Sequence, residues 1–287
     1  MELVKLHPLF GVEIRHVNVA APMAESIFSA IRAALEEQAL LLFRDQQIDD
    51  DAQIAFSRRF GPLETTISAN PAGGTLFARQ SNLDMATHEV IPPDDPRMIY
   101  QKANLLWHSD SSFKPVPAFC SLLSARLVPR EGGDTEFADM RAAYEALPEA
   151  TKHRLEGLVA EHSLAHSRAQ VDPTVLTAAQ KAEAPPVKQV MVRVSPVTGR
   201  KSLFIGAHCG RVVGWPEEEG RSFVRHLMEI SIKPEFCYVH RWRDGDLVVW
   251  DNRCLLHRAT PYDGARYQRL MQRTTVAGDG PTVPQYR

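Results

Sequence analysis

The chain has 287 residues, of which 44% are hydrophobic and 24% are charged, and its formal net charge is −2. This balance fits a globular protein with a sizeable core, and it provides neither the basic surface that binds nucleic acid nor a polybasic membrane patch. Residues 1–5 lack the features of a signal peptide, and no run of about 18 apolar residues could span a bilayer, so we predict a cytoplasmic, soluble protein.

In the first half of the chain, apolar spacing and turn residues predict two helices and three strands. Residues 24–39 carry apolar side chains every four residues, which is typical of a helix packed on a core. A second helix follows Asp50 and Asp51, which can cap it, and ends at Gly61. The strands are expected at residues 39–43, 105–110 and 119–127.

The second half is predicted to hold three more helices and three more strands. The helices are expected from Asp139 to Leu147, from Pro148 to Leu158, and after Pro216, where three glutamates favour a helix start. The strands are expected at residues 190–194, 236–242 and 246–250.

The order of these elements indicates the fold class. Strands and helices do not alternate regularly and no glycine-rich phosphate loop is present, which argues against a doubly wound nucleotide-binding fold. We therefore predict a mainly β core with flanking helices, in a single domain that spans residues 1–287. Residues 68–98 and 170–188 look irregular, and such long loops are either lids over a site or plain surface excursions.

Four cysteines are spread along the chain without any Cys-x-x-Cys pair, at Cys120, Cys209, Cys237 and Cys254. This spacing indicates neither a zinc knuckle nor a disulfide framework, so we expect reduced thiols in the core.

A histidine and a carboxylate two positions apart, His108 and Asp110, are the first candidate metal ligands. In an extended strand they would point to the same face and could hold one ion together. The spacing alone is usually incidental, so a third ligand is needed. His257, which follows the apolar strand at residues 246–250, can supply it, and two histidines with one carboxylate suit iron(II).

Two arginines near the C-terminus, Arg269 and Arg273, are candidate anion ligands. They share a face with Met271 in an extended strand, so both guanidiniums could line one cavity and each could grip a carboxylate. The alternative is an edge strand that carries solvated arginines.

Taken together, these motifs resemble the taurine/2,4-dichlorophenoxyacetate dioxygenase family of iron(II)- and 2-oxoglutarate-dependent oxygenases. The resemblance rests on Trp-His-x-Asp at 107–110, Gly-Gly-Asp-Thr at 132–135, Trp-Asp-Asn-Arg at 250–253 followed by His257, and Arg-x-x-x-Arg at 269–273. It spans nearly the whole chain, and residues 106–113, 132–144 and 204–208 look more like the phenoxyacetate branch. The family implies a double-stranded β-helix core of the jelly-roll, cupin-like kind.

The resemblance also implies a role for each motif residue. His108, Asp110 and His257 would hold iron(II). The reaction would use 2-oxoglutarate and O2 as co-substrates. Thr135 and Arg269 would bind the distal carboxylate of 2-oxoglutarate. The residues implied to face an anionic substrate are Arg273, Asn104 and His208.

Four other residues near these motifs are expected to be structural. Trp107 and Trp250 would pack the barrel walls beside the iron. His162 and His166 recur at helix-like spacing, and we expect them to serve packing rather than metal binding.

The function implied by the resemblance is hydroxylation of the ether-bearing carbon of an aryloxyalkanoate such as 2,4-dichlorophenoxyacetate. The products would be a phenol, an oxo acid, succinate and CO2. The same chemistry on a sulfonate or alkyl sulfate is the first alternative. A non-catalytic binding module and a zinc hydrolase are further alternatives, although neither needs both Thr135 and Arg269. The family also implies a homo-oligomer, a dimer or higher.

Overall fold

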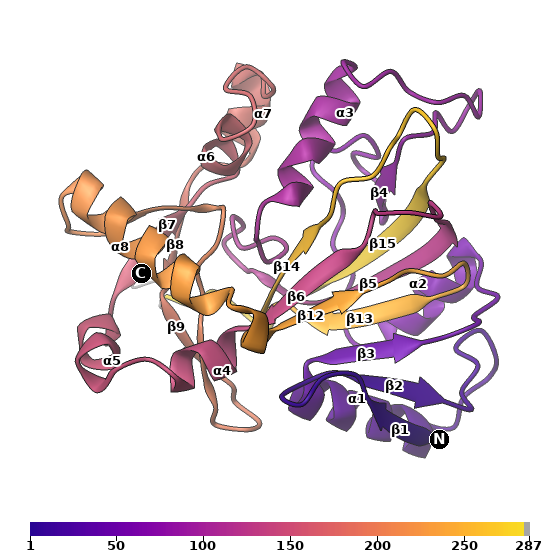
Figure 1. Ribbon diagram of the computed structural model, residues 1–287, viewed down its shortest axis with the longest axis horizontal. Coiled ribbons are helices and arrows are strands. Elements are labelled where there is room, and N and C mark those ends of the chain that lie inside the picture. Colours follow the sequence, from indigo (N-terminus) through magenta and orange to yellow (C-terminus); the bar gives the residue numbers. More distant parts are fainter. Residues whose placement is uncertain (284–287) are drawn as a thin grey trace.

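The computed structural model describes residues 1–283, and its largest part is a seven-stranded sheet (Figure 1). The strand order is β1-β2-β3-β13-β5-β15-β4, and all neighbouring pairs are antiparallel except β2 with β3. Its strands are β1 (Glu2–Lys5), β2 (Val12–Arg15), β3 (Leu40–Phe43), β4 (Ala78–Ser81), β5 (Ala118–Leu127), β13 (Leu247–Asp251) and β15 (Leu270–Ala277).

Three smaller antiparallel sheets complete the β structure of the described residues, with orders β12-β6-β14, β11-β7-β8 and β10-β9. Their strands are β6 (Thr135–Asp139), β7 (Val159–His162), β8 (Val187–Val190), β9 (Val192–Val194), β10 (Lys201–Leu203), β11 (Cys209–Val212), β12 (Cys237–His240) and β14 (Leu255–Ala259).

The helices lie around these sheets, and none of those described is long and apolar enough to cross a membrane (Figure 1). The α-helices are α1 (Glu25–Gln38), α2 (Asp50–Arg58), α3 (Pro96–Gln101), α4 (Met140–Glu145), α5 (Glu149–Leu155), α6 (Leu164–Ala169), α7 (Ala178–Glu183) and α8 (Glu217–Ser231). Two 3-10 helices are η1 (Lys102–Leu105) and η2 (Pro234–Phe236).

The two faces of the large sheet bury different cores, because side chains alternate along each strand. On β13, Leu247 and Val249 pack with the apolar stripes of α1 and α2. Val248 and Trp250 point to the other face, where they meet Phe137 of β6 and neighbouring residues of the β12-β6-β14 sheet. The space between these two sheets is therefore a packed core at one end, and the candidate site lies where that core ends.

Most sequence-predicted elements are confirmed. The helix expected at 24–39 is α1, the helix after Pro216 is α8, and Asp139 caps α4 by accepting a hydrogen bond from the Arg141 backbone N–H. The strands expected at 39–43, 119–127, 236–242 and 246–250 correspond to β3, β5, β12 and β13.

Several boundaries were wrong. Asp49 rather than Asp50 or Asp51 caps α2, and the strand expected at 190–194 is broken at Met191 into β8 and β9. The helix expected from Pro148 ends at Leu155, because the chain must reach β7 at Val159.

The strand predicted at residues 105–110 does not form. Residues 102–105 are the 3-10 helix η1, and His108 makes only an isolated bridge to His257. The chain turns immediately afterwards, with Ser111 in the left-handed region at φ 54° and the Lys114 N–H bonded to the Ser111 carbonyl. His108 and Asp110 thus approach one another at a turn rather than along a strand.

The two stretches expected to be irregular contain secondary structure. Residues 68–98 include the edge strand β4. Residues 170–188 include α7, whose N-terminus is capped by Thr177 and Gln180 in a capping box. The stretches also contact each other, since Glu183 accepts hydrogen bonds from the backbone and hydroxyl of Ser68.

Candidate metal and anion site

Two histidines from distant parts of the chain are held side by side by their own backbones. The His108 N–H donates to the His257 carbonyl at 3.0 Å, and the His257 N–H donates back at 2.8 Å. This exchange places the imidazole ring centroids 4.2 Å apart. The fixed backbone pair means that neither ring needs a metal to bring it to the other.

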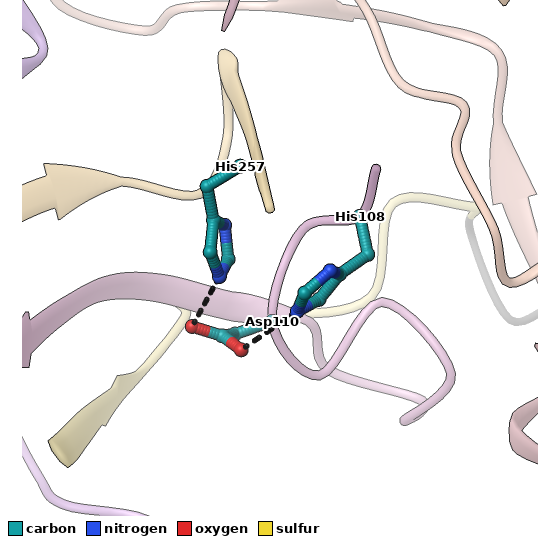
Figure 2. A group of neighbouring side chains, drawn as sticks. All are labelled: His108, Asp110 and His257. Atoms are coloured by element: carbon teal, nitrogen blue, oxygen red, sulfur yellow. Dashed lines mark ion pairs between the residues drawn. The ribbon is translucent and has the colours of Figure 1, made fainter. Parts of the chain in front are cut away.

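Asp110 completes a group that can hold a metal ion (Figure 2). Its Oδ1 lies 3.9 Å from His108 Nε2 and its Oδ2 lies 3.7 Å from His257 Nε2. All three residues are buried, and their ligand atoms lie within 4.8 Å of one another. Two imidazole nitrogens and one carboxylate on one side of an ion form a donor set that suits iron(II) and leaves other positions open.

The protonation states of this group favour a divalent cation. Burial lowers the pKa of both imidazoles, and that of His257 falls well below its ordinary value. Burial acts to raise the pKa of Asp110, but the neighbouring Arg273 guanidinium keeps it below its usual range. Neutral imidazoles and an ionised carboxylate are the forms that bind metal.

Hydrogen bonds orient two of the three candidate ligands. The Leu106 carbonyl lies 2.7 Å from His108 Nδ1, so that nitrogen donates and Nε2 keeps its lone pair. Asp110 accepts from the Ser121 hydroxyl at 2.7 Å, and its backbone N–H donates to Asn252 at 3.0 Å. His257 Nδ1 is buried and has no hydrogen-bond partner among the described residues.

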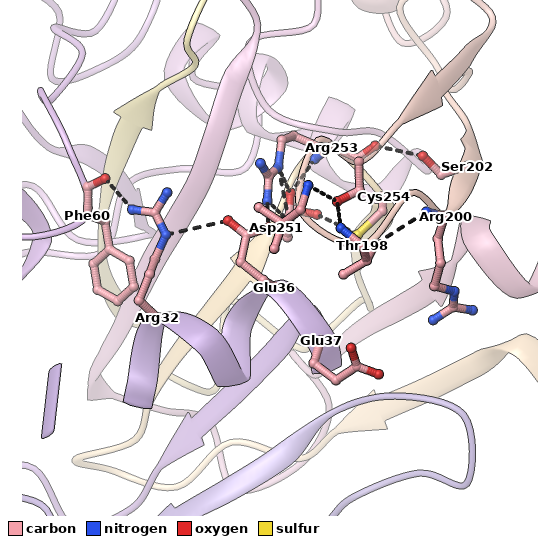
Figure 3. A network of polar contacts seen from close by, with 12 residues as sticks. Arg32, Glu36, Glu37, Phe60, Thr198, Arg200, Ser202, Asp251, Arg253 and Cys254 are labelled. Carbon is pink, nitrogen blue, oxygen red and sulfur yellow. Dashed lines mark hydrogen bonds and ion pairs between the residues drawn. The ribbon is translucent and has the colours of Figure 1, made fainter. Parts of the chain in front are cut away.

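The Trp-Asp-Asn-Arg motif divides its side chains between two places. Trp250 and Asn252 face the candidate ligands: the Trp250 ring centroid is 4.7 Å from that of His257, and its Nε1 donates to Asn252 at 3.0 Å. Asp251 and Arg253 face away and join a network with Glu36 of α1 (Figure 3). The sequence predicted packing beside the ligands for Trp250, and its full burial against His257 fits that role.

Thr135 and Arg269 line one cavity with His108, His257 and Arg273. Arg269 is buried, yet it has no carboxylate partner among residues 1–283, and its guanidinium makes only long contacts to the Gln80 and Gly133 carbonyls at 3.4 and 3.3 Å. Its Nε has no partner, and burial lowers its pKa. A buried guanidinium in this state fits a carboxylate ligand.

Gly133 allows the Gly-Gly-Asp-Thr turn to lie against Arg269. Its φ is +69°, and a Cβ there would come within 2.8 Å of the Pro129 side chain and 3.4 Å of Arg269 Nε. A larger residue would therefore strain the backbone and crowd the guanidinium.

Trp242 sets the direction of the Thr135 hydroxyl, a contact that the sequence did not predict. Its indole N–H donates to Thr135 Oγ1 at 2.9 Å. An indole can only donate, so this bond uses a lone pair of the hydroxyl and leaves its hydrogen free to donate elsewhere. Thr135 is thereby prepared to meet an acceptor in the cavity.

Arg273 lines one cavity with Arg269, as expected, but it also makes an ion pair that the sequence did not predict. Its Nη1 lies 2.5 Å from Asp110 Oδ1, so it pairs directly with a candidate metal ligand. It also lines the larger hollow that His108 and Asp110 border. The guanidinium can thus hold Asp110 in place and still face a ligand with its other nitrogens.

Asn104 and His208 both border the space in front of the histidines. The Asn104 amide donates to Gln80 Oε1 at 2.5 Å. His208 is buried, with Ser112 Oγ 3.2 Å from its Nδ1, and its Nε2 has no partner in the described structure. Burial lowers the pKa of His208 well below its ordinary value, so it is a neutral ring at the wall of the hollow.

A larger hollow, bordered by His108 and Asp110, is also lined by residues that sequence reasoning missed. They include Tyr100, Phe113 and Arg168. Tyr100 and Phe113 pack with Leu164 of α6 and Leu176, which belongs to the second long stretch. No local pattern distinguished these residues, because their shared position arises only when α3, α6 and the two long stretches meet.

The chain was compared with known proteins. Residues 2–275 match the family described as taurine catabolism dioxygenase TauD, TfdA family. The chain is 42% identical to an alpha-ketoglutarate-dependent 2,4-dichlorophenoxyacetate dioxygenase of Cupriavidus pinatubonensis, covering 94% of this chain and 96% of that protein. It is 38% identical to a (S)-phenoxypropionate/alpha-ketoglutarate-dioxygenase of Sphingobium herbicidovorans, with 97% and 95% covered.

A solved structure is similar over the same extent. The crystal structure of AAD-2 in complex with Mn(II) and N-oxalylglycine superposes with a TM-score of 0.91 at 41% sequence identity. The match covers 98% of this chain and 100% of AAD-2.

Proposed function

Because the chain belongs to the TauD, TfdA family of dioxygenases, we propose that it hydroxylates the ether-bearing carbon of an aryloxyalkanoate such as 2,4-dichlorophenoxyacetate. It is a 2-oxoglutarate-dependent dioxygenase that uses iron(II), 2-oxoglutarate and O2. When bound, these groups supply the oxidant: one oxygen atom enters the substrate C–H bond, and the other enters succinate as CO2 leaves. The hydroxylated carbon is a hemiacetal, which collapses to a phenol and an oxo acid.

His108, Asp110 and His257 would hold the iron. Their burial, their protonation states and the 4.8 Å span of their ligand atoms support this assignment. The Leu106 carbonyl would keep the Nε2 lone pair of His108 directed at the ion.

Thr135 and Arg269 would bind the distal carboxylate of 2-oxoglutarate. The observation that carries this assignment is a buried guanidinium with no carboxylate partner in residues 1–283, in the same cavity as the candidate metal ligands. A dicarboxylate that reaches from the metal to Arg269 would supply the missing counter-charge. The Thr135 hydroxyl, directed by Trp242, would donate a hydrogen bond to it.

The organic substrate would occupy the hollow that His108 and Asp110 border. Arg273, Asn104 and His208 all border it and would contact the substrate. Its wall also carries aromatic rings, Tyr100 and Phe113, which suit an aryl group. The names of the two similar enzymes described above favour a phenoxyalkanoate over a sulfonate or alkyl sulfate.

We further propose that the sheets form a double-stranded β-helix, of the jelly-roll, cupin-like kind, in one domain over residues 1–287. Residues 68–98 and 170–188 would act as lids. Their mutual contact through Ser68 and Glu183, next to the hollow, supports this role.

The test is turnover of the purified protein with iron(II), ascorbate and 2-oxoglutarate. We expect phenol and succinate in equal amounts from 2,4-dichlorophenoxyacetate, with lower rates from taurine and an alkyl sulfate. If succinate formed with the sulfate but no aryloxyalkanoate released phenol, the proposed substrate class would be wrong and the proposed type of reaction would still hold. No succinate with any compound would favour the binding module.

A further inference from the structure

Four cationic side chains border the hollow in front of the candidate metal ligands, and they differ in how their charge is balanced. Lys114 pairs with Glu64 at 2.6 Å, and Arg273 pairs with Asp110 at 2.5 Å. Arg79 donates to Gln272 at 3.4 Å, and Arg168 has no ion pair within residues 1–283. Two of the four positive charges are therefore already matched by carboxylates of the chain.

Arg168 is the cation least satisfied by its surroundings. Its Nε is buried without a hydrogen-bond partner, and its one side-chain hydrogen bond is a 3.4 Å contact to Ser167. The guanidinium stacks on the Tyr100 ring, with Cζ 4.3 Å from the centroid. A guanidinium held flat on an aromatic ring keeps the N–H groups at its edge available for a planar anion.

The position of Arg168 relates it to the reaction centre. It borders the same hollow as His108, His208 and Arg273. It is carried by α6, whose Leu164 packs with Tyr100 and Leu176. A ligand in the hollow would thus meet Arg168 on the side of α6 and Arg273 on the side of β15.

We propose that Arg168 binds the anionic group of the organic substrate together with Arg273, and that it determines the preference for an acid over a neutral analogue. This inference rests on the proposed function and adds a residue to it. Arg273 shares its charge with Asp110, so an incoming carboxylate finds little net attraction there. Arg168 supplies a positive charge that no carboxylate of the described residues matches. Unlike Arg79, whose Nε donates to Gln272, it has a buried Nε without a partner, which a bound anion would satisfy.

A consequence of this arrangement is that the substrate anion would connect α6 to the large sheet. Tyr100, Leu164 and Leu176 belong to one apolar cluster, and Arg168 contacts this cluster through the Tyr100 ring. Binding of an acid would therefore stabilise this part of the chain, whereas a neutral analogue would stabilise it less.

The experiment compares an acid with its amide in matched variants. Calorimetry under anaerobic conditions, with iron(II) and 2-oxoglutarate present, measures the Kd of 2,4-dichlorophenoxyacetate and of 2,4-dichlorophenoxyacetamide. We expect Arg168→Gln to raise the Kd of the acid at least about tenfold and that of the amide less than about twofold. Arg168→Lys should recover part of the loss, because it restores the charge without the fork.

Arg79→Gln is the matched control, since Arg79 borders the same hollow but already donates to Gln272. It should leave the ratio of acid to amide affinity within about twofold of the wild type. The KM for 2-oxoglutarate should be unchanged in both variants. Equal weakening of acid and amide by Arg168→Gln, or an unchanged Kd for the acid, would overturn the inference.

The outcome also separates this inference from the proposed function. If the wild type binds an alkyl sulfate but no aryloxyalkanoate, the substrate class is wrong, and the sulfate then serves as the probe for Arg168. An Arg168→Gln enzyme that binds that sulfate as tightly as the wild type would reject Arg168 as the anion ligand. A wild type that binds neither anion would overturn both proposals.

Discussion

The turn that links β13 to β14 contributes to two buried polar clusters that differ in how their charges are balanced. One is the candidate site, where His257 Nδ1, His208 Nε2 and Arg269 Nε have no partner among the described residues. The other is the network of Asp251, Arg253 and Glu36 (Figure 3), where the guanidinium contacts both carboxylates.

This difference separates ligand binding from structural support. A buried charge that is already paired and hydrogen-bonded contributes to a single packed arrangement, whereas an unpaired one is costly unless a ligand satisfies it. Arg253 ties α1 to the β13–β14 turn, with Arg32 of α1 also 3.5 Å from Glu36. Arg269 and Arg168 contact no carboxylate in residues 1–283, and we interpret both as ligand-binding groups.

The largest expected effect concerns the candidate site rather than the network of Asp251, Arg253 and Glu36. His257→Ala should lower kcat/KM at least about 1,000-fold, which is about 4 kcal/mol of transition-state stabilisation, and should reduce the iron bound per chain. Its side chain has no hydrogen bond to lose among the described residues, so the apoprotein should lose no more than about 2 kcal/mol of unfolding free energy. Metal analysis and urea unfolding measure the two quantities. Near-normal activity would reject His257 as a ligand.

Arg253→Met should have the opposite profile. It leaves Asp251 buried without its cation and leaves Glu36 with only the 3.5 Å contact to Arg32. Breaking such a buried pair costs about 3–5 kcal/mol of unfolding free energy. The folded fraction should retain kcat within about twofold, because Arg253 faces away from the candidate ligands. Urea unfolding and single-turnover assays are the measurements, and Arg253→Lys, which keeps the charge, is the control. A large fall in kcat with little loss of stability would reverse the roles of the two clusters.

The sequence predicted the parts of this division that depend on short motifs, but not the parts that depend on long-range packing. His108, Asp110, Thr135 and Arg269 stand in short motifs with distinctive spacing, and the structure brings them to connected cavities. The opposite directions of Asp251 and Asn252 were not predicted, because they follow from the strand register and the turn.

Contacts between distant segments of the chain were not predicted from the sequence, for the same reason. The Arg273–Asp110 pair, the Trp242–Thr135 bond and the position of Arg168 each join parts of the chain that no local pattern relates. The strand at 105–110 was predicted from a short apolar run, but Leu105 is exposed and only His108 makes a bridge to β14.

His162 tests whether every unpaired buried group marks a ligand site. Neither of its ring nitrogens has a side-chain partner, and its ring stacks on Phe204 at 5.4 Å, yet it borders neither the hollow nor the cavity. Burial lowers its pKa to about 3. In the unfolded chain His162 therefore takes up a proton near pH 6.5, whereas in the folded chain its ring stays neutral. The free energy of unfolding falls as the pH drops below 6.5.

His162→Phe keeps the stacking and removes this proton-linked loss. The wild type should lose about 1.4 kcal/mol of unfolding free energy through His162 between pH 7.5 and 5.5, and the variant should lose that much less. Urea unfolding of both proteins at the two pH values measures how much unfolding free energy each one loses. Subtracting one loss from the other removes the contributions of the other titrating groups, which the two proteins share. An identical pH dependence would contradict the lowered pKa of His162. A loss of activity in the variant would assign His162 to the candidate site.

The smallest expected effect concerns Trp242, which acts on the candidate site through Thr135. Trp242→Phe removes the indole donor, so the Thr135 hydroxyl can rotate and a hydrogen bond to 2-oxoglutarate weakens by about 1 kcal/mol. We expect the KM for 2-oxoglutarate to rise about fivefold while kcat and the KM for the organic substrate stay constant. Arg269→Lys, which replaces the fork by a point charge, should raise the same KM further.

A double-mutant cycle separates this orienting role from simple packing. If Trp242 acts only through the Thr135 hydroxyl, then Trp242→Phe should leave the KM for 2-oxoglutarate unchanged in a Thr135→Val background. Additive effects of the two substitutions would mean that Trp242 shapes the cavity by bulk alone. Trp242 would then belong with Arg253, as a residue that supports the fold rather than the ligand.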